Sequence, residues 1–128
     1  MPHVEVSHGE LVDKWTILEI KSVQLLDIEQ LMNVKREMNA MSPAIQEFIG
    51  SISQLHKDLF ETNLMIWNLM NDLYNKDDSH GSQYVALTID ITKFNQKRSF
   101  IKKEIDQFCK SDFSEAKSYF ENRNQVIK

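Results

Sequence analysis

Charged side chains within apolar helical rows are the residues of this sequence that could carry chemistry. Arg98 stands in a row whose other members, at steps of three and four, are apolar, and Glu19 stands in a similar row on an earlier segment. A guanidinium buried without a partner is costly, so Arg98 requires a carboxylate, and Glu19 is the best candidate. Asn63 and Thr62 lie midway along a third apolar row, where they could complete a buried polar network.

Such a cluster has a structural and a functional interpretation. In the structural one, the polar residues fix the register of the helices, or Arg98 extends its guanidinium to solvent. In the functional one, charged groups between helices form a pocket, as they do in helical bundles. The pocket would bind an anionic group through Arg98, Lys14 and Lys102. A carboxylate would act there as acid, base or hydroxyl acceptor, from Glu10, Asp13 or Glu19.

Metal and cofactor motifs give little support to a specific reaction. Glu10 and Asp13 form an E-x-x-D pair that could hold a hydroxylated or metal-bound ligand, but such pairs occur by chance on many helices. The four histidines lack the spacing of a zinc site. The usual hydrolase, nucleotide and dinucleotide motifs are absent. We therefore predict no metal and no cofactor, and the sequence leaves open whether the protein is an enzyme.

The composition is that of one water-soluble domain made of helices. The chain has 128 residues, of which 41% are hydrophobic and 27% charged, with only three Gly and two Pro to make turns. This composition favours long helices over a multi-stranded sheet. A lone Cys109 cannot form an intramolecular disulfide, residues 1–10 lack the features of a signal peptide, and no long apolar run occurs. A cytoplasmic protein without membrane contact is expected.

The charges are unevenly distributed along the chain. Residues 1–90 carry 6 Lys/Arg and 14 Asp/Glu, a balance of −8, whereas residues 91–128 carry 9 and 5, a balance of +4. A basic helix that packs beside acidic ones explains this division. A nucleic-acid-binding face on the basic segment is the weaker alternative, because Phe94 and Phe100 are spaced as core residues.

Capping residues and apolar spacing place four helices. Ser7 and Glu10 form a capping box for a helix over about 8–26, and Asp27 caps a second over about 28–41. Ser42 and Pro43 are expected to begin a third helix, over about 43–76, with a possible bend at Gly50. A polar loop separates it from a fourth helix over about 83–109, and one more helical turn is expected over 115–120.

These segments predict an all-α protein. The expected architecture is an antiparallel helical bundle built on a long helical hairpin, residues 43–76 and 83–109, with the two shorter N-terminal helices packed on it. Residues 1–120 would form the single domain, and 121–128 a polar, frayed C-terminal tail. Residues 3–6 alternate in polarity and could form an extended arm or an edge strand.

Residues 9–21, GELVDKWTILEIK, resemble the signature of a bacterial family of small helical proteins of unknown function, which begin with a GELIDKITILEIK-like helix. Asn63 with Ile66 and Trp67 is similar to the family's N-x-x-L-W element. Residues 95–98 and 101–105 are similar to its N-D-x-R…L-K-R-E-I segment, and residues 111–119 to its S…E-E-K-S-Y ending. The chain departs from the family after Trp67, where Met70 and Asn71 replace acidic residues.

The resemblance singles out polar residues of a candidate site, and it suggests a link to cell-surface polysaccharides. The positions form a candidate ligand site or buried polar cluster: Glu10, Asp13, Lys14, Glu19, Asn63, Asn95, Arg98 and Lys102. Some relatives accompany genes for glycosyltransferases or cell-surface polysaccharides. The departure at residues 70 and 71 removes the third carboxylate that a metal site would need.

Three functions follow, in order of support. The first is an interaction or accessory protein that self-associates, as a dimer, because the apolar faces of 43–76 and 83–109 are wider than one short bundle can bury. It would serve a partner protein in cell-surface polysaccharide metabolism. The second is a protein or enzyme that binds a small anionic or sugar-like molecule between its helices. The third is nucleic-acid binding.

Overall fold

A computed structural model describes residues 2–75 and 81–110 of the chain. Within these residues the protein is all-α and contains no strand. The helices are α1 (His8–Gln24), α2 (Ile28–Gln46), the short 3-10 helix η1 (Ile49–Ile52), α3 (Ser53–Tyr74) and α4 (Gly81–Cys109). The predicted fold class is therefore confirmed. The predicted turn over 115–120, the family-like ending over 111–119 and the tail over 121–128 lie outside the described residues.

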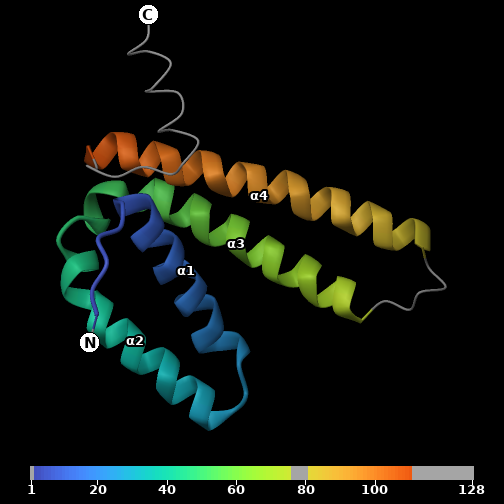
Figure 1. Ribbon diagram of the computed structural model, residues 1–128, viewed down its shortest axis with the longest axis horizontal. Coiled ribbons are helices and arrows are strands. Elements are labelled where there is room, and N and C mark those ends of the chain that lie inside the picture. Colours follow the sequence, from blue (N-terminus) through green and yellow to red (C-terminus); the bar gives the residue numbers. More distant parts are fainter. Residues whose placement is uncertain (1, 76–80, 111–128) are drawn as a thin grey trace, which may run out of the picture.

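The α3–α4 hairpin is the long axis of the molecule (Figure 1). α1 packs on both helices of the hairpin, and α2 packs on α1. α4 has 29 residues and α1 has 17, which correspond to lengths of about 43 and 25 Å. Because α1 is shorter and crosses the hairpin obliquely, it covers the end of the hairpin that holds the start of α3 and the end of α4. The other end projects beyond α1 and α2 (Figure 1).

The two N-terminal helices begin at the predicted capping residues. The Ser7 side chain accepts a hydrogen bond from the backbone N–H of Glu10 at 3.1 Å, and the Asp27 side chain accepts one from Glu29 at 2.9 Å. Each cap satisfies a backbone donor that the first turn of a helix leaves without a partner. Residues 2–6, the predicted arm, are non-helical and exposed.

The junction between α2 and α3 differs from the prediction. Ser42 and Pro43 were expected to begin a helix, but Pro43 lies inside α2, which ends at Gln46, and α3 begins at Ser53. The prediction was wrong because Pro43 does not begin a helix: α2 continues through it, at the cost of one backbone hydrogen bond, and ends three residues later at Gln46. η1, which contains Gly50, separates the two helices, so the apolar row from Ile45 onward belongs to three elements.

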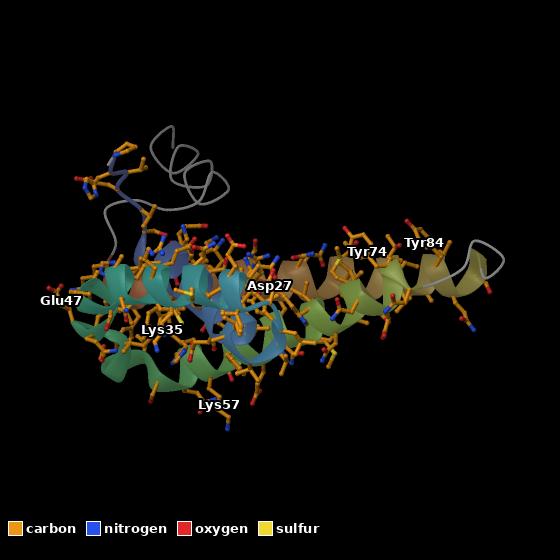
Figure 2. The ribbon with its side chains drawn as sticks, turned by 90° about the horizontal axis from the view of Figure 1, so that it is seen from below. Asp27, Lys35, Glu47, Lys57, Tyr74 and Tyr84 are labelled. Carbon is orange, nitrogen blue, oxygen red and sulfur yellow. The ribbon has the colours of Figure 1, made fainter. Side chains whose placement is uncertain are left out.

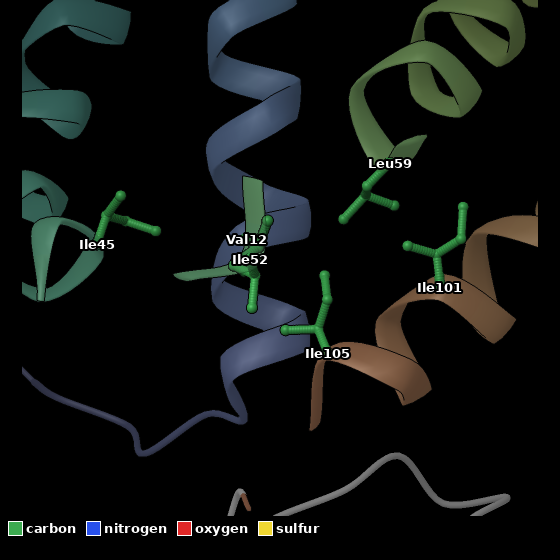
Figure 3. Packing of buried hydrophobic residues seen from close by; sticks show 6 residues of the cluster. All are labelled: Val12, Ile45, Ile52, Leu59, Ile101 and Ile105. Carbon is green, nitrogen blue, oxygen red and sulfur yellow. The ribbon is translucent and has the colours of Figure 1, made fainter. Parts of the chain in front are cut away.

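The core is a cluster of aliphatic side chains beneath the first turns of α1. Ile45 of α2, Ile52 of η1 and Leu59 of α3 meet Val12 of α1 and two isoleucines of α4, Ile101 and Ile105 (Figure 3). Each of the six is at most 5% exposed. The turn at η1 allows Ile45 and Ile52 to enter this core from different elements.

Gly9 sets the distance between α1 and α4. A Cβ atom at this position would lie 2.3 Å from the backbone oxygen of Lys102 and 2.9 Å from Oδ1 of Asp106. The Gly9 backbone N–H also donates to that Asp106 oxygen at 2.6 Å. Only glycine permits this contact, which brings the polar residues of α1 and α4 within reach of each other.

In the described part of the chain, none of the helices combines the length and the apolar character needed to cross a membrane.

Candidate functional site

Asp13 is the centre of a buried polar cluster between α1, α3 and α4. Its side chain is 3% exposed. Arg98 of α4 donates from Nε to Oδ1 at 2.8 Å and from Nη2 to Oδ2 at 2.5 Å. This two-point contact is the strongest geometry available to an arginine and a carboxylate. The Arg98 side chain itself remains 29% exposed, so the pair lies at the edge of the core.

Asn63 connects α3 to the same carboxylate. Its Nδ2 donates to Oδ1 of Asp13 at 3.0 Å and to Oγ1 of Thr16 at 2.7 Å. The Thr16 hydroxyl in turn donates to the backbone oxygen of Asp13 at 2.7 Å. Asn63 and Thr16 are both buried, so these bonds replace the water that the packing of α1 on α3 excludes from the Asn63 amide N–H groups and the Thr16 hydroxyl.

Lys102 completes the cluster. Its Nζ lies 2.9 Å from Oε2 of Glu10 and 3.8 Å from Oδ2 of Asp13. Lys102 is buried, whereas the Glu10 side chain is 48% exposed. Two carboxylates and two cations thus meet, and their formal charges cancel. Among the described residues, no buried side-chain nitrogen or oxygen is left without a hydrogen-bond partner.

The predicted pairing of Arg98 with Glu19 is wrong. Glu19 lies 2.8 Å from Nε2 of His56 on α3, and both side chains are partly exposed. Glu19 follows Asp13 by six residues, which places it about 240° further around the helix. It therefore faces α3 while Asp13 faces Arg98. His56 was not singled out from the sequence, where it lies in a mainly apolar row that also contains Asn63.

Two other predicted residues lie at the margin of the cluster. Asn95 accepts a long hydrogen bond, 3.5 Å, from Nη1 of Arg98 and is exposed. Lys14 is also exposed, because it follows Asp13 directly and so points about 100° away from it. The structure therefore brings five of the eight predicted residues into the cluster: Glu10, Asp13, Asn63, Arg98 and Lys102.

The sequence also held a signal for residues that were not predicted. Arg98, Lys102 and Asp106 follow one another at steps of four, which places them on one face of α4. Asp106 is buried where it accepts the Gly9 N–H. Two of the charged side chains that made α4 a candidate nucleic-acid face, Arg98 and Lys102, are thus directed toward acidic residues of α1.

The cluster is arranged for structure more than for acid–base chemistry. Both oxygens of Asp13 already accept hydrogen bonds from Arg98, and one also accepts from Asn63. A carboxylate in this state is not placed to take a proton from a ligand. Within residues 2–75 and 81–110, no group of three His, Cys, Asp or Glu side chains is arranged to hold a metal ion.

A pocket of about 380 Å³ opens beside the cluster, between α1, α3 and α4. Arg98 and Asn63 form one part of its lining, and Asn71 contributes a third polar side chain. The rest is apolar and aromatic, with side chains from Ile17, Ile20, Ile66, Trp67, Met70 and Tyr74. The charged cluster therefore borders an apolar pocket through its arginine and its amide.

Cys109 at the end of α4 is expected to react slowly with alkylating reagents. Burial raises the pKa of its thiol, and the Asp106 carboxylate raises this pKa further. Because the thiolate is the nucleophile, iodoacetamide should modify the folded protein more slowly near neutral pH than the same chain in urea. As pH rises, the rate for the unfolded chain should level off first. An equal or faster rate in the folded protein would contradict this prediction.

The fold and the cluster define the class of protein: within the described residues, it is an all-α bundle in which an ion-pair network joins α1 to α4. No protein-family model, no curated protein and no solved structure matches the chain.

Proposed function

We propose that the protein is a helical interaction protein that self-associates through the projecting part of its hairpin. We call this part, residues 66–75 of α3 and 81–92 of α4, the distal hairpin. The observation that carries the proposal is that large apolar side chains on the distal hairpin are exposed while charged residues are nearly absent from it.

The exposed apolar residues come from both helices. Tyr74 is 81% exposed on α3, and α4 contributes Tyr84, Val85 and Ile89, each between 48% and 56% exposed. Tyr74 and Tyr84 lie on the part of the hairpin that α1 and α2 leave uncovered (Figure 2). Two helices alone bury only the faces that they turn toward each other, so an apolar surface of this kind is typical of an interaction site.

The charge of the distal hairpin favours a second copy of the chain as the partner. Asp72 and Asp90 are the only charged residues in its 22 positions, against 27% charged residues in the whole chain. Residues 76–80, which connect the two segments in the sequence, add Lys76, Asp77 and Asp78. In a dimer with two-fold symmetry each surface patch meets its own copy, so a strongly charged patch would repel itself. A patch with few charged residues avoids this repulsion. The centres of protein–protein interfaces also contain fewer charged residues than the rest of the protein surface.

Two distal hairpins packed together would form a four-helix bundle, the usual way in which helical hairpins bury their apolar faces. Some relatives in the family that the chain resembles accompany genes for glycosyltransferases or cell-surface polysaccharides, and we propose that the dimer serves a partner protein in that metabolism.

Light scattering coupled to gel filtration tests this proposal. The wild-type chain of 15.0 kDa should elute with a mass of about 30 kDa. The double variant Tyr84→Lys/Ile89→Lys should elute as a monomer, because burial of two unpaired ammonium groups would weaken association by roughly a hundredfold or more.

A matched control uses exposed apolar residues outside the distal hairpin. Val23 and Ile28 are 77% and 74% exposed near the junction of α1 and α2. The variant Val23→Lys/Ile28→Lys should remain a dimer. A monomeric wild type, or the same mass for both double variants, would overturn the proposal.

A further inference from the structure

The pocket beside Arg98 has the size and composition of a small-molecule site. Its volume of about 380 Å³ falls within the range of ligand pockets in proteins, roughly 300–1,000 Å³. Such pockets combine apolar walls with a few fixed polar groups. All of its lining comes from one chain, but five of the lining residues, from Ile66 to Tyr74, belong to the distal hairpin, so a ligand and a second copy of the chain would share part of this surface.

The walls of the pocket favour a flat, apolar molecule. Ile17 and Ile20 of α1 face Ile66, Trp67 and Met70 of α3 across it, and Trp67 is half-buried. An indole bordering a pocket offers a large aromatic surface on which another ring can stack or pack edge-on. Met70 has a flexible side chain that adapts to the shape of a bound group.

The polar part of the pocket is held in position before any ligand arrives. Arg98 is oriented by its two hydrogen bonds to Asp13, and Asn63 by its bonds to Asp13 and Thr16. Side chains that are already ordered lose little conformational freedom when a ligand binds. The two N–H bonds of the Asn63 amide are used by Asp13 and Thr16. The guanidinium of Arg98, with its five N–H donors, is therefore the group that suits this part of the pocket to a hydrogen-bond acceptor.

The charges next to the pocket favour an uncharged ligand. The carboxylates of Glu10 and Asp13 already balance the cations of Arg98 and Lys102. An anion bound at Arg98 would add an unmatched negative charge close to the buried Asp13, and it would also lose its hydration. A neutral acceptor such as a carbonyl oxygen incurs neither cost.

We propose that this pocket binds an uncharged, mainly aromatic small molecule that presents one hydrogen-bond acceptor to Arg98. The ligand class thus differs from the anionic or sugar-like molecule that the sequence predicts, because Asp13 holds the position on Arg98 that a ligand carboxylate or phosphate would take.

Phenylacetamide and phenylacetate are suitable probes because they share a ring and differ in charge. The chain contains two tryptophans, and Trp67 lines the pocket whereas Trp15 packs against the core. In spectra of the full-length ¹⁵N-labelled protein, phenylacetamide should shift the Trp67 indole N–H signal in a saturable way and leave that of Trp15 in place. A Trp15→Phe variant assigns the two signals. Phenylacetate should bind at least about fivefold more weakly.

Two methionines of α3 provide a matched pair of variants. Met70 lines the pocket, whereas Met65 is 44% exposed and lies outside its lining. Met70→Ala should weaken phenylacetamide binding by about fivefold or more, and Met65→Ala should leave it unchanged. Neither substitution touches the Asp13 cluster, so both variants should fold.

Three results would overturn the proposal: no saturable shift of Trp67 in the Tyr84→Lys/Ile89→Lys variant up to the solubility limit of phenylacetamide, equal shifts of both indole signals, or tighter binding of phenylacetate. The same titration of the Tyr84→Lys/Ile89→Lys variant tests whether the pocket binds phenylacetamide when the protein is a monomer. Binding to the monomeric variant would support the pocket whether or not the wild type forms a dimer.

Discussion

Replacement of Asp13 by alanine should lower the free energy of unfolding by about 3–5 kcal/mol, a large share of the roughly 5–15 kcal/mol that stabilises a domain. The substitution leaves the guanidinium of Arg98 and the ammonium of Lys102 without their shared buried partner, and it removes one acceptor of Asn63. Urea denaturation followed by circular dichroism measures the change. A loss below about 1 kcal/mol would show that the cluster is solvated and contributes little.

Glu10 provides the control for this prediction, because it binds the same lysine from a 48% exposed position. Glu10→Gln should cost less than about 1 kcal/mol, as is usual for exposed ion pairs. The double variant Asp13→Leu/Arg98→Leu should be more stable than Asp13→Ala, since it removes both members of the closest pair and leaves less uncompensated charge. If the double variant were the less stable protein, the cost would have to arise from packing.

The substitution Gly9→Ala should destabilise the protein by about 3 kcal/mol. The new methyl group would lie 2.3 Å from the backbone oxygen of Lys102, which cannot move aside as a flexible side chain could. α1 would have to shift away from α4, and the buried hydrogen bond from Gly9 to Asp106 would lengthen or break. Overpacking and a lost buried hydrogen bond each cost roughly 1–3 kcal/mol. The midpoint of urea denaturation measures the loss.

Gly50 is the matched control, because a Cβ atom there would meet no atom within 4 Å. Gly50→Ala should leave the stability unchanged or raise it by up to about 1 kcal/mol, since alanine restricts the unfolded chain. Equal effects of the two substitutions would contradict the role of Gly9 in the approach of α1 to α4.

Local signals in the sequence located most of the helices. Ser7 and Asp27 cap α1 and α2 through hydrogen bonds that span only two or three residues, so their effect could be predicted from the adjacent sequence. The apolar spacing of α4 predicted a helix over 83–109, and the observed helix begins two residues earlier. The end of α2 was missed for two reasons. Ser42 and Pro43 match the start of a helix, and the apolar row that begins at Ile45 continues past Gly50, so it cannot show where the backbone turns.

The candidate site was predicted as a set of residues but not as a set of pairs. Steps of three and four showed that Arg98 and Asn63 face other helices, and the need of a buried guanidinium for a carboxylate indicated an acidic residue on the first helix. Whether that residue was Glu19 or Asp13 depended on how α1 is rotated against α4. The close contact at Gly9 determines this rotation, and no property of α1 alone reveals it.

The sequence by itself thus determined the helical class, the caps of α1 and α2 and five of the residues of the polar cluster, because each depends on neighbours within one or two turns. Only the tertiary structure decided the partner of Arg98, the pocket beside it and the exposure of the distal hairpin. These features depend on the relative lengths, crossing and rotation of α1, α3 and α4, which are determined by contacts between residues far apart in the chain.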